Sequence, residues 1–289
     1  MVSHLILSMR PYQWTKNLFI FAGLVFSQNV LHAGLFLKAV LAFGAFCLLT
    51  GAVYIINDVI DLKEDSLHPK KRSRPIASGR VPKHVALSVA IPLALFSLFF
   101  SFSLHRGFGE TALIYCVIMI LYSLFLKRVV ILDVLVISAG FILRVVAGAV
   151  LVEVTVSSWL LTCTIFLSLF LALGKRRYEL IIMEQGTGGN RQVLHRYSVP
   201  LVDQLIAVVA ASTLLSYALY TMSEATVRKF GSEDLKLTIP FVVYGLFRYL
   251  YLIHVRKEGG NPGKDLLSDR ALLIDVLLWV VAVFFILYA

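Results

Sequence analysis

Three aspartates and an asparagine lie at regular spacing in the string NDVIDLKED, which holds Asn57, Asp58, Asp61 and Asp65. If a helix continues through this string, Asn57, Asp61 and Asp65 fall on one stripe, with Asp58 beside them. Mg²⁺ is usually held by one or two carboxylates, while substrate phosphates complete its coordination. The string therefore predicts a magnesium site for a diphosphate. The alternative is a polar helix end that passes into a solvated loop.

A strongly basic, proline-containing loop follows directly, with the sequence SLHPKKRSRPIASGRVP. Its prolines prevent one continuous helix. Arginine forks and lysine point charges are typical ligands of a pyrophosphate or a sugar phosphate. We therefore expect this loop to cover the acidic stripe and to supply phosphate-binding residues, namely Lys70, Arg72 and Arg74. A loop that only orients the chain in a membrane would explain the sign of its charge but not the neighbouring acids.

Two further polar positions stand out from the apolar sequence. Lys175 and Glu179 are four residues apart in GKRRYEL, a spacing that an ion pair on a helix would also explain. Arg144 lies within an apolar run, and an arginine inside a membrane span indicates function, facing an anion or a carboxylate. The alternative for Arg144 is a structural pair, for instance with Asp133. No two histidines are four residues apart, which disfavours a zinc site.

The composition indicates that a lipid bilayer surrounds the elements that must position these residues. Of 289 residues, 59% are hydrophobic and only 15% are charged, compared with about 25% charged in soluble domains. Several apolar runs approach the roughly 18 residues that span a membrane. We predict an all-α integral membrane protein with a single domain over residues 1–289. Its nine expected helices are Leu18–Val30, Phe36–Asn57, Val85–Leu104, Ala112–Leu126, Val130–Val152, Trp159–Gly174, Leu201–Met222, Leu237–Val255 and Ala271–Ala289.

The positive charges predict how these helices are oriented. With the N-terminus inside, 20 of the 27 lysine and arginine residues fall in inner segments and five in outer ones. This asymmetry follows the positive-inside rule and indicates an N-in, C-out topology. The formal net charge of +10 is thereby mostly explained by topology, and no nucleic-acid partner is needed to account for it.

The chain resembles the UbiA superfamily of intramembrane prenyltransferases, whose signature NDxxDxxxD is matched by NDVIDLKED. Within the superfamily it is similar to the branch that transfers 5-phosphoribose from phosphoribosyl pyrophosphate to a polyprenyl (decaprenyl-like) phosphate. The strings that carry this resemblance are RPYQWTKN, HPKKRSRPIASGRVP, LRVVAG, GKRRYEL and SDRALL. The resemblance implies nine helices around a cavity that opens to the cytoplasm, in a multi-pass protein of the cell membrane. It also implies Mg²⁺ and a role in lipid-linked pentose and cell-wall arabinan synthesis.

One departure from the aromatic prenyltransferases of this superfamily distinguishes the branches. Their second aspartate-rich motif, after the sixth helix, is replaced here by Lys175, Arg176 and Glu179. One acidic and one basic motif suit a donor that carries a pyrophosphate and a separate 5-phosphate. We therefore expect a pentosyltransferase in which Asp58, Asp61 and Asp65 place Mg²⁺ and Asn57 orients the pyrophosphate. The expected substrate-binding residues are Lys16, Lys70, Arg72, Arg74, Tyr122, Arg144, Lys175, Arg176, Tyr178, Glu179 and Arg270.

Two alternatives remain open at this level. An aromatic prenyltransferase would use the same fold, with a prenyl diphosphate on the acidic stripe and a quinone precursor as acceptor. A non-catalytic lipid transporter or binding protein would use Arg144 as a site midway across the membrane, but it leaves NDVIDLKED unexplained. The sequence does not decide whether the chain forms a homo-oligomer.

Overall fold

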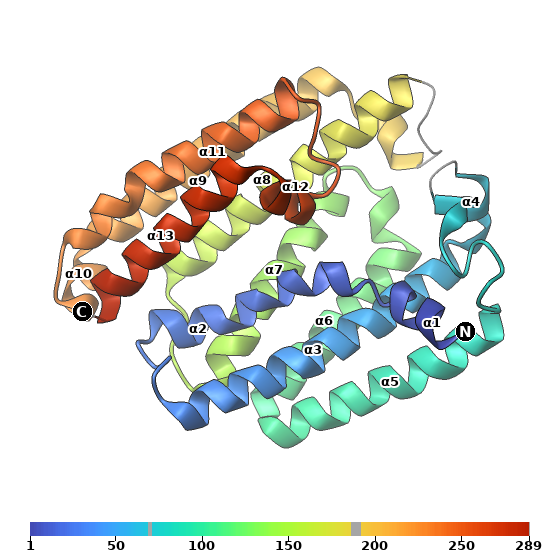
Figure 1. The fold of residues 1–289 in the computed structure, drawn as a ribbon, viewed down its shortest axis with the longest axis horizontal. Helices are drawn as coiled ribbons and strands as arrows, with labels where there is room; N and C mark the ends of the chain where they lie inside the picture. The colour runs from blue at the N-terminus through green and yellow to red at the C-terminus, as the bar shows by residue number, and fades with distance from the viewer. Residues whose placement is uncertain (69–70, 186–191, 289) are drawn as a thin grey trace. The chain divides into compact units, whose positions relative to one another are not determined.

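The structure, a computed structural model, describes residues 1–68, 71–185 and 192–288, and every regular element among them is a helix (Figure 1). The chain forms two compact units. Unit 1 comprises residues 1–156 and 183–196, and unit 2 comprises residues 157–182 and 197–289. The α-helices of unit 1 are α1 (Val2–Ser8), α2 (Phe21–Phe26), α3 (Ala33–Ile60), α4 (Leu62–Leu67), α5 (Lys83–Leu104), α6 (Arg106–Leu124) and α7 (Leu132–Leu151). Its 3₁₀-helices are η1 (Pro11–Ile20), η2 (Lys71–Ser73), η3 (Leu126–Arg128) and η4 (Gln192–Arg196).

Most of helix α8 (Ser158–Glu184) belongs to unit 2. The later elements of that unit are α9 (Val199–Met222), α10 (Glu224–Phe230), η5 (Asp234–Thr238), α11 (Ile239–His254), α12 (Pro262–Ser268) and α13 (Arg270–Tyr288).

Eight helical segments of the described chain are long and apolar enough to cross a membrane. They are α3, α5, α6, α7, α8, α9, the stretch from Asp234 to His254, and α13. Each corresponds to one of the nine expected helices, and the all-α prediction is confirmed for the described residues. The count of nine and the N-in, C-out orientation stay predictions.

The first expected helix, Leu18–Val30, takes a different form. Its beginning completes the 3₁₀-helix η1, and α2 then continues for only six residues. The polar sequence Ser27-Gln28-Asn29 follows, and Gln28 has a positive φ of 61°, which a helix cannot accommodate. This stretch is therefore shorter and less regular than the other expected spans.

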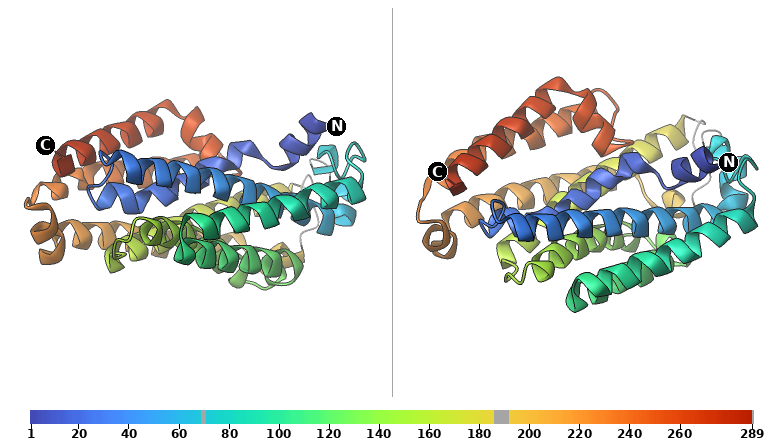
Figure 2. Two further views of the ribbon diagram at one scale, coloured as in Figure 1. Left: turned by 90° about the horizontal axis from the view of Figure 1, so that it is seen from below. Right: turned by 60° about the horizontal axis from the view of Figure 1, so that its bottom comes forward.

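Close helix packing defines the centre of unit 1. Helix α3 packs along α5, α5 packs against α6, and α6 packs against α7 (Figure 2). A Cβ atom at Gly148 would lie 1.8 Å from the carbonyl oxygen of Ile20, so only glycine lets η1 approach α7 this closely. Small residues commonly allow such approaches between membrane helices. The consequence is that η1 is held firmly against the helix that carries Arg144.

In unit 2, helix α11 packs against α13 and α9. A polar chain connects α13, α9 and η5: the indole of Trp279 donates to the hydroxyl of Tyr217 over 2.9 Å, and that hydroxyl lies 2.6 Å from the Thr238 hydroxyl. Buried polar groups need such partners because water cannot reach them.

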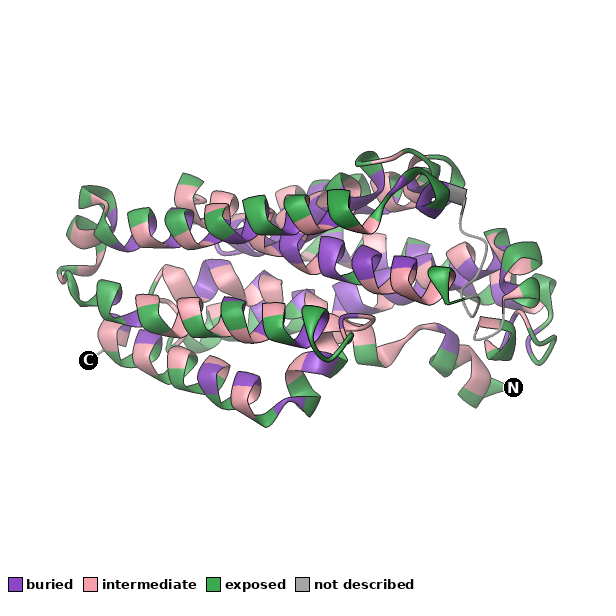
Figure 3. Cartoon of the chain, turned by 90° about the horizontal axis from the view of Figure 1, so that it is seen from above, coloured by how far each residue is buried: buried purple, intermediate pink, exposed green. Residues whose placement is uncertain are grey.

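Exposed residues recur along the long helices (Figure 3), and they include large apolar side chains such as Phe99 in unit 1 and Phe285 in unit 2. Such a distribution is costly in water and favourable in hydrocarbon. It agrees with a multi-pass membrane protein.

Candidate active site

The acidic motif lies where α3 ends and α4 begins. The helical hydrogen bonding continues through it, because the Asp61 amide donates to the Asn57 carbonyl over 2.9 Å and the Asp65 amide donates to the Asp61 carbonyl over 2.8 Å. The helical spacing predicted for Asn57, Asp61 and Asp65 is thereby confirmed. Asp58 and Asp65 are buried, while Asn57 and Asp61 are half-buried.

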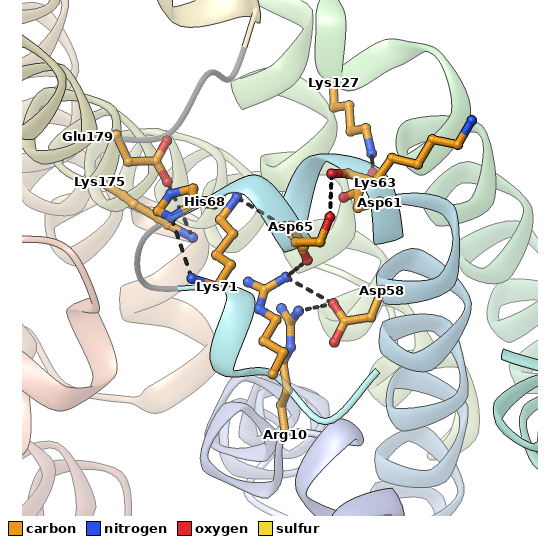
Figure 4. Close-up of polar contacts among 12 residues, drawn as sticks. Arg10, Asp58, Asp61, Lys63, Asp65, His68, Lys71, Lys127, Lys175 and Glu179 are labelled. Carbon is orange, nitrogen blue, oxygen red and sulfur yellow. Dashed lines mark hydrogen bonds and ion pairs between the residues drawn. The ribbon is translucent and has the colours of Figure 1, made fainter. Parts of the chain in front are cut away.

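Cationic side chains from other parts of unit 1 meet two of these carboxylates. Arg10 donates a hydrogen bond to Asp58 (Figure 4). A single Arg74 nitrogen, Nη1, lies 3.0 Å from Asp58 Oδ1 and 2.5 Å from Asp65 Oδ2. Lys71 Nζ is 3.7 Å from Asp65. Burial opposes the charge on Arg10, but Asp58 and weaker neighbours outweigh it and raise the pKa of the guanidinium.

The position of the Arg74 guanidinium marks a point where a cation contacts two carboxylates, as Mg²⁺ would. Its Nη1 atom occupies a point where one cation contacts carboxylates from both α3 and α4, so Asp58 and Asp65 converge on one position. Mg²⁺ needs one or two such carboxylates and takes its other ligands from phosphates and water. The donor set therefore fits this ion. Within the described ranges, no group of three or more His, Cys, Asp or Glu side chains is close enough to share a metal.

Asp61 has a different partner, the ammonium group of Lys127 in η3 (Figure 4). The Lys127 side chain is 9% exposed, and next to it Arg128 lies 3.7 Å from Glu64. Lys127 was not among the site residues predicted from the sequence. Arg10 was likewise not assigned, although it begins the string RPYQWTKN. The signal for both was weak, because their partners are 66 and 48 residues away.

The predicted phosphate-binding residues of the basic loop have separate environments. Arg74 bridges the two aspartates, as described above, whereas Arg72 in η2 is exposed. Lys70 lies outside the described residues. Tyr122, another predicted substrate contact, is half-buried near the end of α6.

Arg144 is 5% exposed and lies deep in unit 1. Its guanidinium donates to Asn17 Oδ1 over 2.8 Å, to the Gly140 carbonyl over 2.7 Å and to the Tyr115 hydroxyl over 2.9 Å. All three partners are neutral. The alternative of a pair with Asp133 is wrong, since eleven residues of one continuous helix separate the two positions by about 16 Å.

Asn17 connects Arg144 to α3. It is fully buried, and its amide nitrogen lies 3.2 Å from both Thr50 Oγ1 and Cys47 Sγ. The preceding residue is Lys16, which was predicted to bind phosphate and which is half-buried. Asn17 therefore fixes the part of η1 that carries Lys16.

The basic island of unit 2 lies on α8. Lys175 Nζ is 3.8 Å from Glu179, so the expected ion pair at this spacing is present, and Arg176 also pairs with Glu179. Arg176 is 1% exposed, whereas the Lys175 side chain is 46% exposed. Arg176 is thus buried beside a carboxylate that it shares with Lys175.

The residues that follow in the island support the local fold. Arg177, which sequence reasoning did not single out, lies 2.6 Å from Asp203 and donates to the Ile253 carbonyl over 2.8 Å. The ring of Tyr178 lies so close to Gly260 that a Cβ there would come within 2.5 Å of it. These contacts hold the island against α9, α11 and the loop after α11.

Arg270, the last predicted phosphate contact, begins α13 and is exposed. Its neighbour Asp269 accepts hydrogen bonds from Arg248 over 3.0 and 2.8 Å and from the Leu272 amide over 2.9 Å. The hydrogen bonds from Arg248 are the main cause that lowers the pKa of Asp269. Asp269 therefore anchors the start of α13, and Arg270 projects from that fixed point.

Comparison with known proteins places these features in a family context. A model of the UbiA prenyltransferase family matches residues 17–176. The decaprenyl-phosphate phosphoribosyltransferase of Mycolicibacterium smegmatis is 33% identical over 97% of this chain and 91% of its own length. Its namesake from Mycobacterium tuberculosis is 30% identical over 98% of this chain and 94% of its own.

A solved structure shows the same fold. The UbiA homolog from Archaeoglobus fulgidus bound to GPP and Mg²⁺ aligns with a TM-score of 0.73 and 18% identity, covering 99% of this chain and 100% of that chain.

Proposed function

We propose that this chain, which belongs to the UbiA prenyltransferase family, transfers 5-phosphoribose from phosphoribosyl pyrophosphate to a polyprenyl phosphate and releases pyrophosphate. The observation that carries the proposal is the near full-length similarity to transferases named for decaprenyl phosphate and phosphoribose. The aromatic prenyltransferase and transporter alternatives have no comparable support. A polyprenyl acceptor also suits a chain with eight apolar helices that can cross a membrane.

The proposed step forms one bond and breaks one. A phosphate oxygen of the acceptor attacks C1 of the ribose while the bond from C1 to the pyrophosphate oxygen breaks, and the bonding electrons leave with pyrophosphate. A phosphate monoester has its second pKa near 6 and is already largely ionised at neutral pH, so no strong general base is required. The protein has to position the two substrates and to stabilise the charge of the leaving group.

The carboxylate cluster of unit 1 suits the pyrophosphate end of the donor. Mg²⁺, held by Asp58 and Asp65 with Asp61 close by, would supply charge that offsets the departing pyrophosphate. Arg74, Lys71 and Lys127 already contact these carboxylates. If the carboxylates held Mg²⁺, these side chains would be available to phosphate oxygens, with Asn57, Lys70 and Arg72 as further candidates.

The basic island, Lys175, Arg176 and Glu179, is proposed to bind the 5-phosphate of the donor. Lys175 and Arg176 both pair with Glu179 and bring two cationic side chains together on α8. Tyr178, Arg270 and Tyr122 are proposed as secondary contacts to substrate. A donor with two separated anionic groups therefore explains why one acidic and one basic motif occur in one chain.

We further propose that the protein lies in the cell membrane with these residues on the cytoplasmic side. The charge asymmetry of the segments between spans supports this orientation. Phosphoribosyl pyrophosphate is a water-soluble donor, and the cytoplasmic side is where it would be met. Supply of lipid-linked pentose for arabinan synthesis follows from the same transfer.

The direct test uses the purified chain in lipid nanodiscs with radiolabelled phosphoribosyl pyrophosphate, decaprenyl phosphate and Mg²⁺. We expect label to move into the lipid fraction, and pyrophosphate to be released in equal amount. Absence of lipid label with any polyprenyl phosphate, together with prenylation of an aromatic acid from a prenyl diphosphate, would replace the proposal with the aromatic alternative.

A further inference from the structure

Among the described residues of unit 1, the buried guanidinium of Arg144 has no acidic partner. Arg144 is 5% exposed, and its three hydrogen-bond partners, Asn17, Gly140 and Tyr115, are neutral. Its guanidinium also lies over the ring of Tyr115, 4.7 Å from the ring centre, and 5.5 Å from that of Phe141. Neutral dipoles and rings orient a guanidinium, but they do not cancel its charge. A buried charge without a counter-charge is costly, so this environment favours an anion.

A second uncompensated cation lies beside it. Lys16 directly precedes Asn17, whose side-chain oxygen accepts a hydrogen bond from Arg144 Nε. In the part of the chain that the structure describes, Lys16 makes neither a hydrogen bond nor an ion pair. Burial, together with the nearby charges of Arg144 and Arg10, lowers the pKa of Lys16 to about 8. Two cations that raise each other's energy are stabilised together by one anion.

This pair lies next to the carboxylate cluster but differs from it in charge. Arg10 acts electrostatically on Lys16 and is itself balanced by Asp58. Asp58 and Arg10 therefore neutralise each other, whereas the neighbouring cations Lys16 and Arg144 have no acidic partner among the described residues of unit 1. An anion beside these two cations would lie near, but not on, the position proposed for the metal and pyrophosphate.

We infer that Lys16 and Arg144 form the binding site for the phosphate of the polyprenyl acceptor. This inference rests on the proposed function, in which the acceptor phosphate must reach the carbon that bears the pyrophosphate. The proposed function assigns other residues to the pyrophosphate and the 5-phosphate of the donor, so the acceptor phosphate is the anion that remains. The aromatic and apolar surroundings of Arg144 suit a phosphate that arrives on an isoprenoid chain rather than a hydrated one.

Binding without turnover provides the test, with farnesyl phosphate as a short soluble acceptor. Its affinity would be measured by isothermal titration calorimetry for the wild type, Lys16→Met, Lys16→Arg and the exposed control Lys38→Met. Loss of one charge-assisted contact corresponds to about 10- to 150-fold weaker binding, and we expect this for Lys16→Met alone. Magnesium-dependent binding of phosphoribosyl pyrophosphate should change less than about threefold in all four proteins.

The pH dependence separates a charged contact from a structural one. Lys16 is cationic below its pKa, so wild-type affinity for farnesyl phosphate should fall as the pH rises beyond about 8. The charged groups that act on it are Arg10 and Arg144. Of the neighbouring titratable groups, Asp58 and Tyr54 contact Arg10, Tyr115 contacts Arg144, and Cys47 contacts Asn17. In Lys16→Arg the fall should disappear, because arginine stays protonated. The same fall in Lys16→Arg as in the wild type would overturn the assignment.

Arg144 is tested with Arg144→Lys and Arg144→Gln after thermal unfolding has confirmed that each is folded. We expect weaker binding of farnesyl phosphate in both, with the larger loss in the neutral variant; if Arg144→Gln does not fold, Lys16→Met decides. Binding of inorganic phosphate as tightly as farnesyl phosphate would show a free-phosphate site, and unchanged farnesyl phosphate binding in Lys16→Met would refute the site. Wild-type binding through Lys16 without any transfer would refute the proposed function but leave the site standing.

Discussion

Two polar clusters of unit 1 differ in how their charge is balanced. At the end of α3, the carboxylates of Asp58, Asp61 and Asp65 are each met by a cation from elsewhere in the unit. Around Arg144, by contrast, the guanidinium has only neutral hydrogen-bond partners, and the nearby Lys16 makes neither a hydrogen bond nor an ion pair in the described chain. The first cluster is complete without ligand and has to exchange partners when a metal and pyrophosphate bind. The second is incomplete without an anion.

This difference suggests how one fold could bind two anionic substrates at the same time. A balanced cluster does not attract a bare phosphate strongly, since each cation already has a carboxylate. It becomes a phosphate site only with a divalent metal, which makes donor binding depend on magnesium. The unbalanced cluster needs no metal, so acceptor binding should be independent of magnesium.

Asp58→Ala should have the largest effect, because it removes one of two carboxylates that converge on the metal position and leaves Arg10 without its partner. Several kcal/mol of charge stabilisation would be lost, which corresponds to about a 1,000-fold or greater fall in kcat. Transfer of label from phosphoribosyl pyrophosphate to lipid measures it, and chelation of the wild type should have the same effect. Binding of farnesyl phosphate should survive in this variant, whereas loss of both functions together would show that the two clusters are not separate.

Arg74→Ala should follow, since one nitrogen of Arg74 holds both Asp58 and Asp65. Two charge-assisted contacts of about 1.5 kcal/mol each correspond to roughly a 150-fold loss in kcat/KM for the donor. Arg80→Ala is the matched control, because Arg80 is an exposed arginine of the same loop. Equal losses in the two variants would indicate that loop charge alone matters.

Lys175→Ala tests the basic island of unit 2, and we expect donor use to weaken by about 10- to 150-fold while acceptor affinity changes much less. Lys264→Ala, an exposed lysine of the same unit, serves as the control. Competition by a ribose 5-phosphate analogue provides the measurement that reports on the 5-phosphate. If the analogue inhibits the wild type and Lys175→Ala equally, the island does not bind that phosphate, and Arg72 or Arg270 becomes the candidate.

Lys127→Met should have the smallest effect of the four, about 10-fold in kcat/KM for the donor, because it removes a single contact to Asp61. Lys127→Arg keeps the charge and should stay within about threefold of the wild type. Initial rates at several magnesium concentrations measure both variants. A larger loss in Lys127→Met than in Arg74→Ala would place the essential carboxylate at Asp61 instead of at the convergence of Asp58 and Asp65.

The sequence by itself determined the features that depend on local pattern. Apolar run length predicted the eight helical segments of the described chain that are long and apolar enough to cross a membrane, and the spacing of NDVIDLKED predicted the helical register that its amides confirm. The match to NDxxDxxxD and the separated strings predicted the family. These signals are local because a helix positions each residue relative to neighbours three and four positions away.

Only the tertiary structure decided which charges meet. The partners of Asp58, Asp61 and Arg144 are Arg10, Lys127 and Asn17, which are 48, 66 and 127 residues distant in sequence. No periodicity connects positions so far apart, and an arginine in an apolar run looks the same whether a carboxylate or an amide will face it. Whether a buried charge is balanced depends on helix packing, because the cost of the charge is set by the groups within a few ångströms of it.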